Sequence, residues 1–542
     1  MDVSTQIREI FAKWDKANAP GCALAVLKER KIIFQQGFGL ANLDYDIPIS
    51  SQTVFRIASV SKQFTAACIV LLAEQGLLSL DDDIRKYISE LPEFKSIVTI
   101  RHLIHHTSGI RDYLDLYSLR GTTDQEFDSV NTDNVLELIK NQKKLNFPPG
   151  EQFLYSNTGY LFLAMIIKRI TGKSLREYAD EYIFKPLGMK HTFFNDEHKM
   201  IIKNRAVGYR AKEEGGFKIN DTRSELVGDG GVFSTIDDLS LWAQIFYENK
   251  FGSENFISTL LTTGKLNNRE GINYSFGLRM KSLGGFPIVT HGGSFFGFRA
   301  DITWLLQHKM AFICLANLSS ITPSNLIEQV VKLYLNDEYK EESSSSQKEN
   351  EQFIKLHEEE FKNIIGKYLM QDYQVPCEIL FENRQLIVII GSQKFLIHPI
   401  NKIHYRSVEG PFNISLIIKE KNITIETNSE SYILEPIKPP TYTLEQLQEY
   451  SGVYYSEELD IVYSVTEEEN QLKIKLREEV SPLIPAFKDV FVGKLNAVGA
   501  SITIGARIAF IRDKQEKVTG FSLSSRRVIS ILFNKIIKKD EI

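Results

Sequence analysis

A polar segment between two regions of different character is the feature that most constrains how this chain can fold. Residues 338–352, EYKEESSSSQKENEQ, are charged and rich in serine, without apolar residues at a helical or strand period. Such a segment buries too little apolar surface to fold alone, so we predict a flexible linker. Because 542 residues also exceed what one hydrophobic core supports, we expect separate domains on either side.

The region before the linker has the pattern of an α/β sandwich. Residues 22–39 contain two β-prone runs joined by a polar turn, which predicts a hairpin. Residues 80–200 are mostly helical in pattern, and 323–337 predict a closing helix. Three further β-prone runs precede that helix, at 286–291, 298–305 and 310–317. We therefore predict an antiparallel sheet formed by both ends of the region and flanked by helices, with an all-helical domain inserted.

The region after the linker contains a weak internal repeat of short β-prone runs. FKNIIGKY at 361–368 resembles LQEYSGVY at 447–454, and each places a glycine two residues before a tyrosine. ENRQLIV at 382–388 likewise resembles ENQLKIK at 469–475. Each copy has roughly the 80 to 100 residues of a small antiparallel barrel. The predicted organisation is a first domain at 1–337, a linker at 338–352, and two β-barrel domains at 353–440 and 441–542.

Charge and cysteine content exclude some classes of protein. A formal net charge of -5 and a pI near 6.1 give no reason to expect a nucleic-acid partner, and we find no recognition motif for one. The four cysteines are scattered singly and without metal-ligand spacing, which predicts reduced, buried thiols: Cys22, Cys68, Cys314 and Cys377.

The N-terminal residues do not have the pattern of a secretory signal. Residues 1–18 alternate charged and apolar positions and contain no continuous apolar core. The longest apolar run, 66–73, is far shorter than the ~20 residues of a membrane span. We therefore predict a cytoplasmic protein with no membrane span, unless an export signal has been removed from the chain.

Three short motifs suggest chemistry: SVSK at 59–62, YSN at 155–157 and HGG at 291–293. Each is weak alone, and an S-x-x-K pattern recurs at 345–348 within the predicted linker. Ser59, however, begins a long apolar helical pattern that ends at Gly76. On that helix Lys62 lies one turn from Ser59 on the same face, and the unpaired Ser59 N–H can donate to an oxyanion.

These residue types fit a serine nucleophile. A hydroxyl such as that of Ser59 attacks well only when a neighbouring base takes its proton. Lys62 can be this base if its surroundings disfavour its charge, or it can hold Tyr155 as a phenolate that takes the proton. The sequence leaves both routes open.

The third motif lies beside a predicted strand. Two adjacent glycines let an extended backbone approach a ligand without obstruction by side chains. We predict the Ser294 N–H as a second oxyanion donor. His291 would offer a hydrogen bond or a positive charge to the substrate or to the region of Tyr155.

Longer blocks around the motifs resemble the serine β-lactamase and DD-peptidase superfamily. The chain is similar to the branch that contains class C β-lactamases, serine esterases and D-aminopeptidases, over roughly residues 10 to 335. The resembling blocks are TIRHLIHHTSGI at 99–110, FPPGEQFLYSNTGY at 147–160, IFKPLGMKHT at 183–192 and GDGGVFSTIDDL at 228–239. The resemblance implies the β-lactamase/transpeptidase fold for 1–337.

The resemblance also implies roles for the motif residues. Acyl transfer would pass through a covalent acyl-enzyme, without a metal or an organic cofactor. Ser59 would attack, Lys62 and Tyr155 would move protons, and Asn157 would position Lys62 and the substrate carbonyl. HHTSG at 105–109 we interpret as a structural turn between helices.

One position departs from many β-lactamases. His291 stands where they have lysine, which argues against antibiotic hydrolysis as the main role, while His291 and Gly293 would line the strand beside the site. Together with the two barrels, this His-x-Gly motif is similar to the D-aminopeptidase group, in which extra domains shape the active-site entrance.

Four functions remain open from the sequence. The leading one is a peptidase or amidase acting on a small-molecule or short-peptide substrate that contains a D-amino acid. Carboxylesterase, and then β-lactamase or DD-carboxypeptidase, follow on the same serine, because pocket shape selects the acyl and leaving groups. A ligand-sensing protein without catalysis is the alternative of another class, and the intact set of Ser59, Lys62 and Tyr155 argues against it.

Overall fold

The chain forms two compact units in a computed structural model. The first comprises Met1–Ile110, Asp124–Lys140 and Phe147–Ser343, and the second comprises Arg111–Thr123, Asn141–Asn146 and Ser344–Ile542. The structure describes residues 2–248, 252–339, 361–370, 375–382, 385–390, 393–399, 403–409, 414–419, 422–427, 431–496, 498 and 503–536. From residue 340 onward the predicted linker lies outside the described residues. The predicted domain boundaries stay a prediction.

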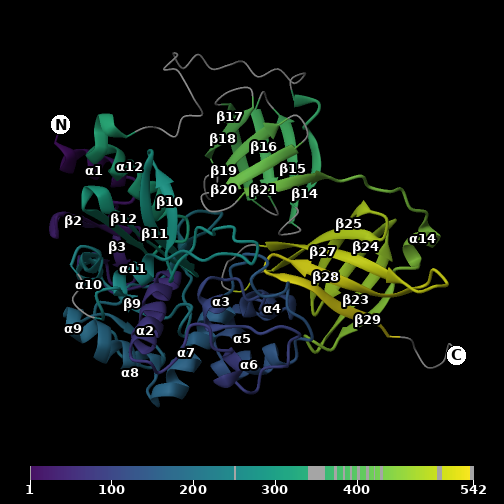
Figure 1. Cartoon of the computed structure of the whole chain (residues 1–542). Helices are drawn as coiled ribbons and strands as arrows, with labels where there is room; N and C mark the ends of the chain where they lie inside the picture. The colour runs from purple at the N-terminus through teal and green to yellow at the C-terminus, as the bar shows by residue number, and fades with distance from the viewer. Residues whose placement is uncertain are drawn as a thin grey trace. The chain divides into compact units, whose positions relative to one another are not determined.

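A six-stranded antiparallel sheet organises the first unit, as the sequence predicted (Figure 1). Its strand order is β10 (Arg279–Leu283), β11 (Phe286–Phe295), β12 (Phe298–Leu305), β13 (Met310–Ala316), β1 (Cys22–Lys28) and β2 (Lys31–Phe38). Both ends of the unit therefore contribute strands. β1 and β13 are buried along almost their whole length, which explains their continuous apolar sequences.

Helices cover the two faces of this sheet. α1 (Val3–Phe11) and α12 (Pro323–Leu335) share a core with alternate side chains of the strands, among them Phe312 and Cys314. On the opposite face, the indole of Trp304 donates to the Ala243 carbonyl oxygen at 3.1 Å, at the end of α10 (Ile236–Ala243). All four cysteines are buried and free, as predicted.

The middle of the first unit is mostly helical, as predicted. Its α-helices are α2 (Lys62–Glu74), α3 (Ile100–Ile104), α5 (Asp124–Phe127), α6 (Thr132–Lys140), α7 (Asn157–Thr171), α8 (Leu175–Ala179), α9 (Lys185–Leu187) and α11 (Phe256–Leu261). Short strands join them: β3 (Leu40–Asn42), β4 (Ile47–Pro48), β5 (Phe55–Arg56), β6 (Phe193–Phe194), β7 (Tyr209–Ala211), β8 (Phe217–Ile219) and β9 (Val232–Ser234). Among the described residues, no helix is both long and apolar enough to cross a membrane.

The second unit contains two closed eight-stranded antiparallel barrels, which confirms the predicted pair. The first barrel consists of β14 (Gly366–Met370), β15 (Val375–Glu382), β16 (Gln385–Ile390), β17 (Gln393–Pro399), β18 (His404–Glu409), β19 (Ile414–Lys419), β20 (Asn422–Thr427) and β21 (Ser431–Pro436). The second consists of β22 (Gly452–Ser456), β23 (Ile461–Glu468), β24 (Gln471–Leu476), β25 (Glu479–Phe487), β26 (Val490–Asn496), β27 (Thr503–Arg512), β28 (Val518–Ser525) and β29 (Val528–Lys535). α4 (Tyr113–Leu119) also belongs to this unit.

The repeated tyrosine makes the same hydrogen bond in both barrels. The Tyr368 hydroxyl donates to the carbonyl oxygen of Ile364 at 2.7 Å, and the Tyr454 hydroxyl donates to that of Tyr450 at 2.6 Å. In each case the acceptor lies four residues before the tyrosine. The weak sequence repeat is therefore a structural repeat.

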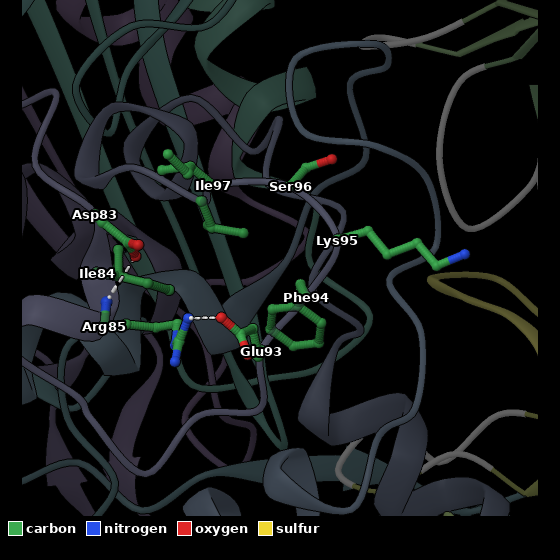
Figure 2. Close-up of a pocket in the computed structure, with 9 residues that line it drawn as sticks. Asp83, Ile84, Arg85, Glu93, Phe94, Lys95, Ser96 and Ile97 are labelled. Atoms are coloured by element: carbon green, nitrogen blue, oxygen red, sulfur yellow. Dashed lines mark hydrogen bonds and ion pairs between the residues drawn. The ribbon is translucent and has the colours of Figure 1, made fainter.

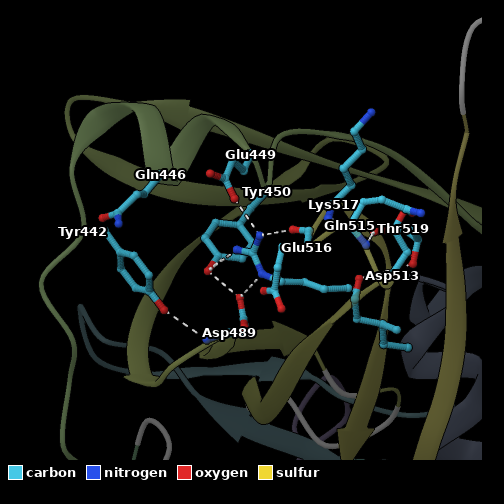
Figure 3. Close-up of polar contacts among 12 residues, drawn as sticks. Tyr442, Gln446, Glu449, Tyr450, Asp489, Asp513, Gln515, Glu516, Lys517 and Thr519 are labelled. Atoms are coloured by element: carbon cyan, nitrogen blue, oxygen red, sulfur yellow. Dashed lines mark hydrogen bonds and ion pairs between the residues drawn. The ribbon is translucent and has the colours of Figure 1, made fainter.

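A polar network centred on Arg512 joins Glu449 and Tyr450, the two residues after α14 (Leu444–Gln448), to the second barrel (Figure 3). The guanidinium donates to Asp489 at 2.9 Å, to the Tyr450 hydroxyl at 3.1 Å and to Glu449 at 2.6 Å. Asp489 also accepts from the Tyr450 hydroxyl at 2.7 Å. Charged hydrogen bonds of this kind hold the segment before β22 against the barrel.

Candidate active site

Ser59 lies at the junction of a short turn and a helix. The turn is a single 3-10 turn over Ala58–Ser61, and α2 begins at Lys62, so the prediction that the helix starts at Ser59 was wrong by one turn. Ala58 has a φ of +49°, an uncommon backbone conformation for a residue with a side chain. The expected proximity is nevertheless present, because the Lys62 ammonium donates to Ser59 Oγ at 3.1 Å.

Lys62 is fully buried and surrounded by acceptors. Its Nζ donates to Asn157 Oδ1 at 2.8 Å and to the carbonyl oxygen of Asp229 at 2.6 Å. With Ser59 Oγ, these atoms supply one acceptor for each of the three N–H bonds of an ammonium group. A buried charge is costly unless it is hydrogen-bonded in this way. Asn157, the first residue of α7, thus contacts Lys62 as the resemblance implied.

Tyr155 packs between Lys62 and a histidine that the sequence analysis had assigned to a structural turn. Lys62 Nζ lies 4.8 Å from the centroid of the Tyr155 ring, and the centroids of the Tyr155 and His106 rings are 4.1 Å apart. His106 Nδ1 accepts from the Ser156 N–H at 3.1 Å. His106 therefore fixes the backbone next to Tyr155 while its ring contacts the phenol, which a turn motif alone could not reveal.

The third motif lies within β11 rather than after a strand. β10 pairs with Phe286–Thr290, and this pairing stops one residue before His291. A Cβ atom at position 293 would lie 2.2 Å from the carbonyl oxygen of Ile57, so only glycine lets the strand approach the turn that contains Ser59 this closely. Ser294 follows on an exposed position of the strand, and its role as an oxyanion donor stays a prediction.

His291 is buried and hydrogen-bonded as a neutral imidazole. Its Nδ1 donates to the Gly292 carbonyl oxygen at 2.7 Å, and its Nε2 is 3.1 Å from the Tyr274 hydroxyl, which donates to it. Burial, together with the positive charges of Arg279 and Lys62, holds the pKa of His291 well below its usual value. This environment favours the hydrogen-bonding role expected for His291 over the positive charge.

A positive charge beside the motif comes instead from Arg279, which the sequence analysis missed. Its Cζ lies 5.6 Å from the centroid of the Tyr155 ring and 5.5 Å from that of Tyr274. Arg279 opens β10 opposite Thr290, and it is partly exposed. No motif marks this residue, because only the pairing of β10 with β11 brings it near Tyr155.

A separate pocket of about 230 Å³ lies on the first unit (Figure 2). None of its lining residues belongs to the predicted site: Asp83, Ile84, Arg85, Glu93, Phe94, Lys95, Ser96, Ile97 and Val98. Three of its charged residues contact one another, since Arg85 lies 3.5 Å from Glu93 and the Arg85 backbone N–H donates to Asp83. Within the described ranges, no group of three or more His, Cys, Asp or Glu residues is placed to hold a metal ion.

A family model described as Beta-lactamase matches residues 7–331, which is more than half of the chain. The chain belongs to the Beta-lactamase family. Ser59, Lys62, Tyr155, Asn157 and the third motif all lie within the matched part of the family member.

Curated relatives of this family member have two different printed names. Penicillin-binding protein 4* of Bacillus subtilis is 28% identical over 74% of this chain and 91% of its own length. A D-aminopeptidase of Gluconobacter oxydans is 27% identical over 55% of this chain, and a D-aminopeptidase of Brucella anthropi is 29% identical over 55%. The matches span 56% of the length of each of these two D-aminopeptidases.

Solved structures of the family share the fold. An octameric penicillin-binding protein homologue from Pyrococcus abyssi has a TM-score of 0.57 at 24% identity and covers 80% of this chain and 100% of its own. A D-amino acid amidase from Ochrobactrum anthropi has a TM-score of 0.52 at 21% identity and covers 62% of this chain and 99% of its own. The β-lactamase/transpeptidase fold is therefore shown for this chain.

Proposed function

We propose that the chain is a serine hydrolase that forms a covalent acyl-enzyme on Ser59. The observation that carries the proposal is the 3.1 Å contact between Lys62 Nζ and Ser59 Oγ, within a site where Asn157 and Tyr155 also contact Lys62. A contact of this length allows direct proton transfer. Ser59 is partly exposed, so its hydroxyl is accessible to a substrate.

The three acceptors around Lys62 give a direction to the proton transfer. When the ammonium loses one proton, its two remaining N–H bonds stay directed at Asn157 Oδ1 and the Asp229 carbonyl oxygen. The lone pair then faces Ser59 Oγ and takes its proton as the Oγ–carbonyl carbon bond forms. Tyr155 passes its proton to the leaving amine or alcohol when the bond to it breaks, and Lys62 replaces that proton with the one it took from Ser59. Water later hydrolyses the acyl ester of Ser59.

For the substrate, we propose a peptide or amide that contains a D-amino acid, as for a D-aminopeptidase. The support is the similarity to proteins of that name and the neutral His291 beside the site. Both ring nitrogens of His291 are hydrogen-bonded within the protein, so this neutral imidazole presents no positive charge that would attract a carboxylate. The N–H groups of Ser59 and Ser294 would stabilise the oxyanion of the tetrahedral intermediate.

Arg279 favours a second candidate, a DD-carboxypeptidase. Its guanidinium lies within 5.6 Å of the Tyr155 ring and is partly exposed, so it can pair with the terminal carboxylate of a peptide. An aminopeptidase substrate carries an ammonium group instead, which this charge would repel.

Turnover of a small substrate panel tests the proposal and separates the candidates. The panel contains D- and L-aminoacyl p-nitroanilides, a peptide ending in two D-alanines, p-nitrophenyl esters and a chromogenic cephalosporin. We expect hydrolysis of the D-aminoacyl anilides, loss of it in Ser59→Ala, and normal rates in Ser345→Ala, which alters the other S-x-x-K pattern. Preference for the D-alanine peptide would establish the second candidate. No reaction with any compound would overturn the proposal and favour a binding protein.

A further inference from the structure

Two strips of chain meet at Tyr155, and each continues directly into the second unit. The Leu154 N–H donates to the His106 carbonyl oxygen at 2.9 Å, and the Gly150 N–H donates to that of Thr107 at 2.8 Å. These bonds pair residues 106–107 with 150–154. The first strip leaves the site at Ile110 and the second enters it at Phe147, so the positions of Arg111 and Asn146 limit where the pair can lie.

A buried ion pair attaches the segment that follows the first strip to the second barrel. Arg111 donates to Glu458 Oε1 at 2.7 Å, and the two side chains are only 1% and 5% exposed. The same guanidinium donates to Gln142 Oε1 at 2.8 Å and to the Ile529 carbonyl oxygen at 2.9 Å. Gln142 in turn donates to the Glu458 carbonyl oxygen at 2.9 Å. One glutamate thus fixes both connecting segments.

The tight turn between β28 and β29 binds the segment that precedes the second strip. The Asn146 amide donates to the Arg527 carbonyl oxygen at 2.8 Å and accepts from the Ile529 N–H at 2.8 Å. It therefore takes the place of a neighbouring strand at this turn. Arg527 also lies 3.5 Å from the carboxylate of Asp112, which is fully buried. We call these residues the clamp: Arg111, Asp112, Gln142, Asn146, Glu458, Arg527 and Ile529.

We propose that the clamp makes the second barrel a positioning element for Tyr155. This inference rests on the proposed function of the Ser59 site. Glu458 and the β28–β29 turn hold the chain immediately after the His106 strip and immediately before the Tyr155 strip. If either of these two attachments is loosened, the paired strips can shift, and the Tyr155 ring then moves relative to Lys62. Acylation depends on that geometry, whereas initial substrate contacts with β11 do not.

Single-turnover acylation of the full chain by a p-nitrophenyl ester tests this inference. Asn146→Ala removes the amide from the turn, and Glu458→Gln removes the charge opposite Arg111. We expect the acylation rate constant at saturating ester to fall ~10-fold or more in both, because small misplacements of catalytic groups are costly. The ester concentration at half-saturation should stay within about twofold. Asn146→Asp, which keeps the acceptor for Ile529, should recover part of the rate.

Arg512→Met is the matched control, because it breaks the polar network of the same barrel outside the clamp. We expect it to lower the melting temperature while acylation stays at the wild-type rate. The inference is overturned if both clamp variants acylate like the wild type, or if Arg512→Met loses as much rate as they do. A wild-type chain that never acylates Ser59 would instead contradict the proposed function, so the two failures are distinguishable.

Discussion

The two barrels share a skeleton, but in the part of the chain that the structure describes the clamp residues lie in turns and strands of the second barrel. Both have eight antiparallel strands in sequential order and the same tyrosine-to-carbonyl hydrogen bond. The second barrel is filled by a column of aromatic rings, with the rings of Phe521 and Phe533 stacked at 4.6 Å and that of Tyr454 4.9 Å from Phe521. The described core of the first barrel likewise mixes aromatic and aliphatic side chains, with the rings of Phe361 and Phe381 stacked at 5.6 Å.

This difference shows that two barrels with the same fold need not have the same role. The repeat explains why both segments close into barrels, because strand length and alternation recur. The clamp residues Glu458 and Arg527 lie in turns of the second barrel, where sequence can change without disturbing the strands. The second barrel thereby holds segments 111–123 and 141–146, which the chain connects to the strips next to Tyr155 in sequence. The eight-stranded fold that the two barrels share therefore does not indicate that the second barrel contributes to the clamp.

The buried ion pair of the clamp gives the largest expected effect. Arg111→Met leaves the Glu458 carboxylate buried without its guanidinium, which should lower the free energy of unfolding of the second unit by about 3–5 kcal/mol. Hydrogen exchange at the amides of β23 and β29 measures this loss. As a control, Lys473→Met removes a partly exposed partner of Glu468 and should cost less than about 1 kcal/mol. Equal protection in Arg111→Met and the wild type would mean that the pair does not hold the second barrel.

One cavity-forming substitution in the core of each barrel should show whether a loss of stability is accompanied by a loss of activity. Phe521→Ala and Leu386→Ala each remove a fully buried side chain, at an expected cost of about 2–5 kcal/mol. Because Glu458, Arg527 and Ile529 of the clamp belong to the second barrel, Phe521→Ala should also lower kcat/KM at temperatures below its melting transition, while Leu386→Ala should not. Loss of activity in both variants, or in neither, would break the comparison.

Part of this arrangement follows from the sequence, and the reasons are local. Ser59 and Lys62 are three residues apart, so a single helical turn, which the structure forms as a 3-10 turn before α2, is enough to bring their side chains together. The continuous β-prone run at 310–317 likewise predicts a strand. Gly366 and Gly452 precede equivalent tyrosines, which was enough to detect the repeat.

The remainder depends on contacts between residues far apart in the chain. Arg279 reaches Tyr155 only because β10 pairs with β11 in one register, which the sequence does not specify. His106 looked like a turn residue, and its contact with the phenol depends on the pairing of two loops. The pair of Arg111 and Glu458 joins residues 347 positions apart, and nothing in either local pattern indicates the other.

Dependence of stability on pH should distinguish the first unit from the barrels. Burial raises the pKa of Asp301 to about 6, although hydrogen bonds from Thr303 and Thr290 oppose the rise. Because its unfolded pKa is about 3.9, ionisation in the fold costs stability, and the cost grows as pH rises from about 4 through 6. Asp301→Asn should therefore stabilise the first unit on the order of 1–2 kcal/mol more at pH 8 than at pH 5.

Urea unfolding followed by tryptophan fluorescence measures this effect, because all three tryptophans, at positions 14, 242 and 304, lie in the first unit. Barrel amides followed by hydrogen exchange serve as the control, and Asp301→Asn should not change their pH dependence. The same benefit from Asp301→Asn at both pH values would contradict the assignment.

The smallest expected effect tests whether the repeated tyrosines are equivalent. Tyr368→Phe and Tyr454→Phe each remove one hydroxyl that donates to a carbonyl oxygen four residues earlier. Each should lower the free energy of unfolding by about 1 kcal/mol, measured by urea denaturation. Costs that differ by more than about twofold would show that the two barrels use this bond differently.

The central claim, that Ser59 is acylated, is tested most directly by locating the acyl group itself. The chain is mixed with the p-nitrophenyl ester that reacts fastest, quenched in acid during turnover, digested and analysed by mass spectrometry. The account predicts the mass of the acyl group on the peptide that contains Ser59, and no such mass in Ser59→Ala. An acyl group on another residue, or the same modification in Ser59→Ala, would contradict it.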